Sequence, residues 1–389
     1  MTDSGVETTA QDAPVKRGSS YPALDGLRAV AALCVVMTHI GFQTGETFRG
    51  SFGALLARLD FGVTIFFLLS GFLLYGPFVR AQLSARPLPD VPTYLRNRAL
   101  RVLPAYWLVV VVVLPVMASG YLHPREVADQ LLLLQVYARN HLLPGLTQMW
   151  SLGVEVTFYL LLPLLAFAVR RSGRPLRAQA VLCGSMAGAA ILWTLSTRGF
   201  GVPDPAVGGL WLPAYLDWFA LGMGLAALRA WHDLTGRGQV LDQIGDAGGT
   251  CVAVGALLLW LTATPLGGPR GLELATPGQA LTKHLLYGAA ALFLLLPAVF
   301  GTDGRSVVRR VLEHPLARYL GSVSYGIFLW HLLVLHLVFK ALGYAPFTGH
   351  LPLVTALVVP LSVAVADLSL RLVERPALAQ KRRWATAGR

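Results

Sequence analysis

Two ionisable side chains, Arg28 and His39, lie 11 residues apart in one apolar stretch of the chain. In an α-helix this spacing brings both side chains to within about 20° of one face, with roughly 16 Å of axial rise between them. An arginine near one membrane surface and a histidine deeper on the same face are typical of the two ends of a polar cavity. The alternative is that Arg28 anchors the helix at the lipid headgroups and His39 is a hydrogen-bonded interior group.

A third ionisable group, Glu155, follows Trp150 and Ser151 at the start of another apolar segment. The membrane orientation that the basic residues predict puts this carboxylate at a depth similar to that of His39. A carboxylate at that depth is able to orient an imidazole ring and raise its basicity, as the partner of a general base must. The alternative for Glu155 is a structural ion pair with an arginine elsewhere in the helix bundle.

Two further motifs have spacings that suit a ligand. Arg98 and Arg101 are i, i+3 neighbours on one helical face, and guanidinium groups bind phosphate through paired hydrogen bonds. Lipid headgroups are an alternative partner for them. Ser70 and Gly71 are small residues near the middle of their segment, where they allow a neighbouring helix or a thin ligand to approach closely.

The sequence contains no pattern typical of a metal site or of a soluble nucleotide-binding enzyme. His331 is expected near the middle of a late apolar segment, and His336, five residues on, points in another direction, so the two do not form a metal pair. Three cysteines lie in apolar stretches without metal-binding spacing and are predicted to be packing residues: Cys34, Cys183 and Cys251.

The composition excludes an ordinary soluble protein, because 55% of the residues are hydrophobic and only 13% are charged. The net charge of +12 comes from basic residues in short loops between apolar segments. This distribution favours membrane lipid as the partner of these charges, and no nucleic-acid partner is predicted.

Apolar segments long enough to span a bilayer recur along the chain and predict an all-α integral membrane fold with about ten transmembrane helices. A piece at 126–137 is amphipathic and too short to span. The predicted spans are 24–42, 60–80, 102–120, 150–170, 178–197, 210–230, 247–264, 281–300, 321–342 and 351–373.

The distribution of basic residues predicts the orientation. With the N-terminus inside, 24 of the 32 lysines and arginines lie on the cytosolic side. Such a bias predicts that both termini are cytosolic. Residues 1–19 are polar and aperiodic and are predicted to be a disordered cytosolic leader, residues 20–376 the membrane domain, and residues 377–389 a basic cytosolic tail.

Taken together and in this order, the motifs resemble the membrane-bound acyltransferase family 3, the O-acyltransferases of bacterial glycans and natural products. The likeness extends from about residue 21 to residue 376. The stretches that carry it are Leu24-Asp-Gly-Leu-Arg28 with His39, Phe66-Phe-Leu-Leu-Ser70-Gly-Phe, Arg98-x-x-Arg101 with Pro104 and Tyr106, Trp150-Ser151-Leu-x-x-Glu155-x-x-Phe-Tyr159, Ser324-Tyr325 with His331, and Val373-Glu-Arg-Pro376.

The resemblance implies an enzyme of the bacterial inner membrane that moves an acyl group from a cytosolic acyl-CoA, most often acetyl-CoA, to a hydroxyl group. The acceptor would be a saccharide or a glycosylated small molecule. His39 would be the general base, Arg28 its partner, and Glu155 the group that holds the imidazole ring. Whether the acyl group passes directly to the acceptor or first to the histidine is left open.

The resemblance also implies a division of the remaining residues between the two substrates. Those assigned to the donor are Arg98, Arg101, Ser70 and Tyr106, and those assigned to the cavity and the acceptor are Trp150, Ser151, Tyr325 and His331. Many relatives carry additional acidic residues where this chain has Thr64 and Val156, so Glu155 is the only carboxylate of its motif. The alternative function is a transporter that uses the same buried groups as a substrate or proton pathway.

Overall fold

The computed structural model describes residues 21–380, except 119, 121–122, 138–141, 171, 173, 202–203, 272 and 303–305. The predicted leader, residues 1–19, and residues 381–389 of the predicted tail lie outside the described residues. Within the described ranges the chain forms helices and no strands, which confirms the all-α class.

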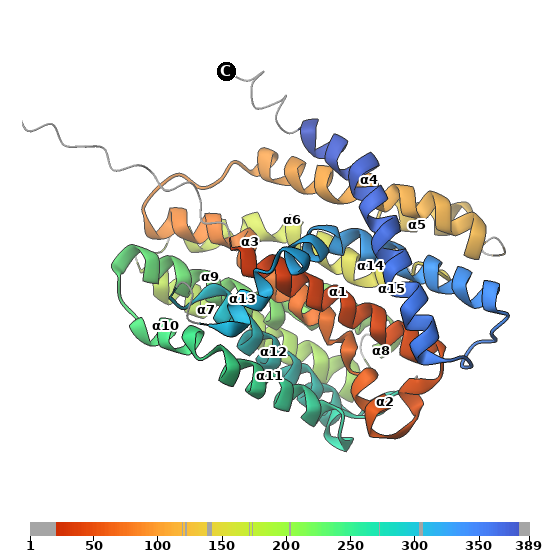
Figure 1. Ribbon diagram of the computed structural model, residues 1–389. Helices are drawn as coiled ribbons and strands as arrows, with labels where there is room; N and C mark the ends of the chain where they lie inside the picture. The colour runs from red at the N-terminus through yellow and green to blue at the C-terminus, as the bar shows by residue number, and fades with distance from the viewer. Residues whose placement is uncertain are drawn as a thin grey trace, which may run out of the picture.

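The α-helices lie where the hydropathy pattern predicts them, with short helices between the long ones (Figure 1). Their bounds are α1 Pro22–Gln43, α2 Gly50–Leu56, α3 Gly62–Leu83, α4 Val91–Met117, α5 Pro124–Leu131, α6 Trp150–Arg170, α7 Pro175–Leu195, α8 Pro205–Gly208, α9 Leu216–Thr235, α10 Gln239–Asp246, α11 Gly248–Thr262, α12 Pro277–Val299, α13 Val307–Leu312, α14 Pro315–Leu342 and α15 Leu351–Ser369.

Each of the ten predicted spans overlaps one of these helices, although the helices differ in how well they suit a bilayer. Within the described residues, eight are long and apolar enough to cross a membrane, and the pair α10 and α11, bent by 73°, makes a ninth. The remaining segment, α9, carries Asp217, Arg229 and Asp233. We infer that this charge content explains why α9 is not among the apolar spans.

Several helix starts follow local sequence signals. Proline occupies the first turn of α1, α7, α12, α14 and α15, where its missing N–H costs nothing. The Asp90 side chain accepts a hydrogen bond from the Thr93 amide at the start of α4, and Thr276 and Gln279 form a capping box at the start of α12. These local signals place the long helices independently of their tertiary contacts.

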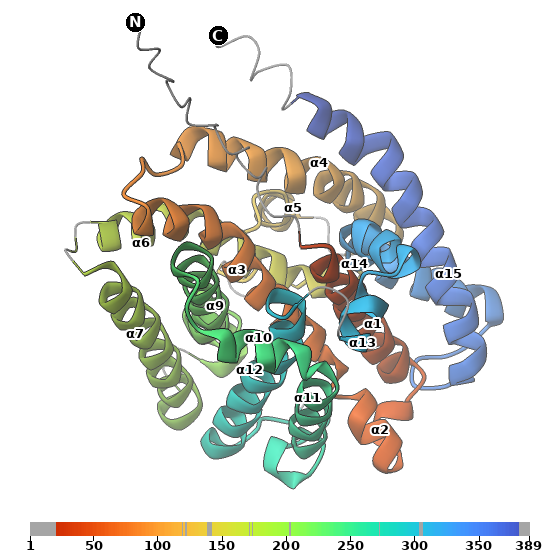
Figure 2. The same cartoon turned by 60° about the vertical axis from the view of Figure 1, so that its left-hand side comes forward.

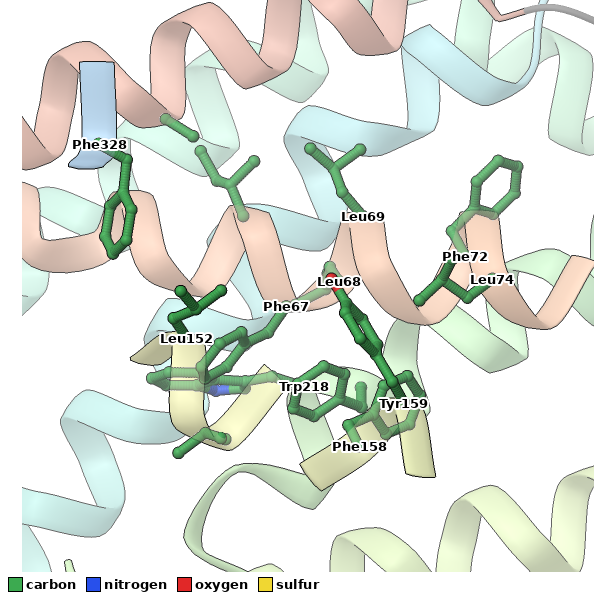
Figure 3. Packing of buried hydrophobic residues seen from close by; sticks show 14 of the residues in the cluster. Phe67, Leu68, Leu69, Phe72, Leu74, Leu152, Phe158, Tyr159, Trp218 and Phe328 are labelled. Carbon is green, nitrogen blue, oxygen red and sulfur yellow. The ribbon is translucent and has the colours of Figure 1, made fainter. Parts of the chain in front are cut away.

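The helix α3 packs closely against α9 because both present glycine at the crossing. A Cβ atom added at Gly71 would lie 2.3 Å from the Phe219 carbonyl oxygen, and one at Gly222 would lie 2.1 Å from that of Leu68. The rings of Phe158 and Phe219 stack at 4.0 Å beside this crossing. Figure 3 shows Phe67, Phe158 and Trp218 grouped in this part of the core.

A second packing layer joins α1 to α14 and α15. Its buried members include Val36, Ile40, Val334 and Val354. Figure 1 shows α15 along the outer side of α14, and Figure 2 shows α7, α9, α11 and α12 on the other side of the bundle. The helices α1 and α3 therefore lie between the two halves, which is where the predicted site residues are.

One end of the bundle is formed by α2 and the loops near it, and we call it the α2 end. Phe42, Phe48, Pro269 and Phe347 come together there from three separate parts of the chain. The opposite end, which we call the arginine end, contains Arg98 and Arg101 at the start of α4. The two ends correspond to the outer and the cytosolic side in the topology that the sequence predicts.

Candidate functional site

A cavity of about 130 Å³, here the central cavity, lies between α1, α3, α4, α6 and α14. Apolar side chains form much of its wall, among them Phe67, Leu152 and Phe328, which Figure 3 labels. Most of the predicted site residues line it: Arg28, Ser70, Arg98, Arg101, Ser151, Glu155 and Tyr325. The structure therefore brings together motifs that are spread over most of the sequence.

Helical periodicity explains how these residues reach one cavity. Arg98 and Arg101 lie one turn apart on α4, as their spacing predicts. Ser151, Glu155 and Tyr159 follow each other at i, i+4 along α6 and all line the cavity. Each helix thus contributes a stripe of side chains, and the helix packing decides which stripes meet.

Glu155 is bound to α3. The Ser70 hydroxyl donates a short hydrogen bond to its Oε1 atom. The expected contact between Glu155 and the His39 ring is not formed, and this part of the prediction is wrong. The physical reason is that α6 presents Glu155 to α3, whereas α1 presents His39 to α14.

The three arginines of the cavity have different partners. Arg28 pairs with Asp25 at 3.2 Å on the same helix. Arg101 pairs with the buried Glu374 at 3.3 Å and lies over the Tyr325 ring at 5.9 Å. Arg98 forms no ion pair in the part of the chain that is described, although Glu155 acts on it electrostatically, and its buried Nε has no hydrogen-bond partner there. Arg98 is therefore the cation of the cavity that is available to a ligand.

The His39 ring contacts a second histidine. Its Nδ1 atom lies 2.7 Å from the Val35 carbonyl oxygen and 3.3 Å from Nε2 of His331. The two ring centroids are 5.0 Å apart. His331 is fully buried, and its Nδ1 lies 2.8 Å from the carbonyl oxygen of Phe328. The predicted acceptor residue His331 is thus a neighbour of the predicted base.

These contacts assign the protons of both rings. A carbonyl oxygen only accepts hydrogen bonds, so Nδ1 of His331 carries a proton and donates it to Phe328. For the same reason Nδ1 of His39 carries a proton, which faces the Val35 carbonyl and the lone pair on Nε2 of His331. In the neutral His39 ring, Nε2 is then the unprotonated and basic nitrogen.

The remaining predicted residues lie outside the central cavity. His39 does not line the central cavity. It lies farther along α1 than Arg28, toward the α2 end. The carboxylate of Asp60 is near enough there to act on the His39 ring electrostatically. The Tyr106 hydroxyl donates to the Gln130 carbonyl, so this buried side chain connects α4 to α5 and does not line the central cavity. Trp150 lines a different cavity, nearer the α2 end.

Two features of the site were missed by reasoning from the sequence. Glu374 belongs to the recognised Val373-Glu-Arg-Pro376 stretch, but nothing local indicated Arg101 as its partner. The contact between His39 and His331 joins residues 292 positions apart. The presence of a histidine in each of two apolar segments was the only available signal. Within the described residues no group of three histidine, cysteine or acidic side chains is placed to hold a metal ion.

Comparison with known proteins supports the resemblance. A family model for an acyltransferase domain matches residues 21–370. Nodulation protein 10 of Rhizobium leguminosarum bv. viciae is 27% identical over 91% of this chain and 92% of its own length. Acyltransferase MdmB of Streptomyces mycarofaciens is 29% identical over 83% of this chain and 82% of its own length.

A further relative is longer than this chain. The peptidoglycan O-acetyltransferase OatA of Listeria monocytogenes is 24% identical over 93% of this chain but only 57% of its own length. No solved structure gives a significant match. Since the family model covers most of the chain and the helices are those of a multi-pass membrane protein, this protein belongs to the membrane-bound acyltransferase family 3 and is an acyltransferase.

Proposed function

We propose that this protein transfers an acyl group, in the first place acetyl, from acyl-CoA to a hydroxyl group of a saccharide or a glycosylated small molecule. The observation that carries the proposal is the combination of an available arginine in a narrow central cavity and a histidine with a free basic nitrogen farther along the same helix bundle. Its relatives include a peptidoglycan O-acetyltransferase, which supports a saccharide acceptor.

The donor would enter from the arginine end. Arg98 has no carboxylate partner in the described residues, and Arg28 and Arg101 lie beside it in the cavity wall. Guanidinium groups bind phosphate well, so these residues would hold the phosphates of CoA. The cavity of about 130 Å³ suits a thin chain such as the pantetheine arm, which would carry the thioester toward His39.

The chemistry at His39 follows from its proton arrangement. Nε2 would remove the proton from the acceptor hydroxyl as the oxygen attacks the thioester carbonyl carbon. A new C–O bond forms, the C–S bond breaks, and the leaving thiolate takes the proton back from the imidazolium. The positive charge that forms on His39 would be stabilised by the Val35 carbonyl and by the lone pair of His331. Attack by Nε2 itself on the thioester is the covalent variant.

Glu155 then has a role different from orienting the histidine. Its carboxylate lines the cavity with the arginines and accepts a hydrogen bond from Ser70. A buried negative charge beside Arg28 and Arg98 lowers the cost of keeping these cations away from water when no donor is bound. We therefore assign Glu155 and Ser70 to the positioning of the donor site.

The test uses purified protein in nanodiscs with radiolabelled acetyl-CoA and a pool of saccharide acceptors. His39→Ala should reduce acetyl transfer by a factor of about 100 or more, because it removes the general base. His336→Ala, on the same helix as His331, is the matched control and should keep wild-type activity. Label retained on the wild-type protein would favour the covalent variant. Full acetyl transfer by His39→Ala would contradict the proposal.

A further inference from the structure

A second cavity, here the α2-end cavity, lies toward the α2 end and has a volume of about 560 Å³. Its wall is built from five separate parts of the chain, including the start of α3, the start of α6 and the start of α12. This volume lies within the range of about 300–1,000 Å³ that is common for small-molecule sites. The central cavity, at about 130 Å³, is too small for a sugar ring beside a thioester.

One wall of the α2-end cavity is aromatic. Trp150 and Tyr215 have ring centroids 5.2 Å apart, and Tyr215 and Trp218 are also 5.2 Å apart. Trp218 stacks on His284 at 4.2 Å with an interplanar angle of 12°. His284 is held in turn by Asp217, whose Oδ1 lies 2.7 Å from its Nε2. The wall is therefore a set of mutually fixed rings that requires little rearrangement to receive a ligand.

Another part of the wall is polar. Lys283 donates to Asp60 at 2.9 Å, and the Tyr287 hydroxyl donates to the other oxygen of the same carboxylate. Arg58 is fixed by backbone carbonyls, among them that of Thr262 at 2.8 Å. Arg198 also lines the cavity, and none of the described carboxylates pairs with it. Its guanidinium group is thus available to a ligand.

The α2-end cavity lies next to the central cavity. Along α3, Val63 lines this cavity and Phe66, one turn later, lines the central cavity. Along α6, Trp150 lines this cavity and Ser151 the central one. Asp60 lines the α2-end cavity and acts electrostatically on His39. A molecule in this space would therefore approach the site from the side opposite to the three arginines.

We propose that the α2-end cavity is the acceptor site and that it binds a saccharide ring against Trp150, Tyr215 and Trp218. This inference rests on the proposed function. A sugar ring has apolar C–H faces that cover aromatic rings, and hydroxyl groups at its edge that hydrogen-bond to charged side chains. A purely apolar ligand would leave the Arg198 guanidinium desolvated without compensation. The aromatic wall and the charged rim together thus favour a saccharide.

The test measures saccharide binding without any donor. Wild-type protein in nanodiscs is titrated with methyl glycosides of a neutral hexose, an N-acetylhexosamine and a hexuronate, and binding is followed by ligand-observed NMR. Trp150→Ala and Arg198→Gln should each weaken binding of the best probe about tenfold. Arg49→Gln is the matched control: Arg49 is exposed near the same end, pairs with Glu46 and lies outside the cavity, and its loss should leave binding unchanged.

A parallel titration with acetyl-CoA separates this inference from the proposed function. Arg98→Gln should weaken acetyl-CoA binding and leave saccharide binding unchanged, whereas Arg198→Gln should show the reverse. Failure of the wild type to bind any of the three glycosides would overturn the saccharide site, as would equal binding by wild type, Trp150→Ala and Arg198→Gln. Saccharide binding in a protein that neither binds nor turns over acyl-CoA would overturn the proposed function and leave the saccharide site standing.

Discussion

At the scale of single residues, the proton on Nδ1 of His39 determines which nitrogen of this ring is free to act as a base. Two acceptors face Nδ1, the Val35 carbonyl and Nε2 of His331. In many enzymes a carboxylate holds the catalytic imidazole in this way. Here a neighbouring histidine and a peptide carbonyl take that position, and no described carboxylate forms a hydrogen bond with the ring.

Substitution of His331 tests its role as a positioning residue. His331→Phe removes the acceptor for Nδ1–H of His39 and should lower kcat about tenfold or more while the KM for acyl-CoA stays the same. His331→Gln offers an amide oxygen to the same proton and should recover part of the loss.

The control for this experiment is the pH dependence of kcat in each variant. If His331 orients the base, the acidic limb of the profile should shift in His331→Phe and return toward the wild-type position in His331→Gln. Equal losses in both variants with an unchanged profile would mean that His331 only fills space.

At the scale of elements, the close crossing of α3 and α9 fixes the position of Ser70. Gly71 follows Ser70 directly and faces the Phe219 carbonyl of α9. Any side chain at Gly71 would push α3 away from α9 and move the Ser70 hydroxyl relative to Glu155. The small residues Ser70 and Gly71 therefore allow close helix packing. Through that packing they also position the wall of the central cavity.

Gly71→Ala should destabilise the protein by about 1–3 kcal/mol, because the added Cβ would overlap a backbone carbonyl that has little freedom to move. The measurement is thermal unfolding in detergent, with acetyl transfer as the second readout. Gly184→Ala on α7 is the matched control, since a Cβ atom there would meet nothing within 4 Å. Gly184→Ala should unfold at or slightly above the wild-type temperature. A wild-type unfolding temperature for Gly71→Ala would contradict the packing argument.

At the scale of the whole molecule, two cavities of different size follow each other along α3 and α6. The narrow central cavity is lined by arginines and suits a thin anionic donor. The wide α2-end cavity is lined by aromatic rings and suits a sugar. In the topology that the basic residues predict, the donor side is cytosolic and the acceptor side is outside. On this arrangement the acyl group would pass from a cytosolic thioester to an acceptor that is reached from the other side.

Labelling of single cysteines tests that orientation. Two exposed residues serve as reporters: Arg49 near α2 and Arg86 between α3 and α4. Each is replaced by cysteine, one at a time, in a variant that lacks the three natural cysteines. A membrane-impermeant maleimide should label Arg49→Cys in intact spheroplasts and Arg86→Cys only after permeabilisation. The opposite pattern would reverse the predicted topology and place the donor cavity on the outer side.

The sequence by itself determined the class of fold, the position of the ten helical segments and most of the polar residues of the central cavity. Hydropathy is a property of contiguous residues, and the period of the helix is constant, so segments and faces are readable without tertiary information. For this reason the spacing of Arg98 and Arg101 led to two residues that share a cavity.

Only the tertiary structure decided which faces meet. It joined His39 to His331 and Glu155 to Ser70, it directed Tyr106 away from the cavity toward α5, and it formed the α2-end cavity from five parts of the chain. These outcomes depend on the rotation and the crossing of packed helices. Neither is set by local sequence, because a single helix presents several polar residues and its neighbours determine which of them become partners.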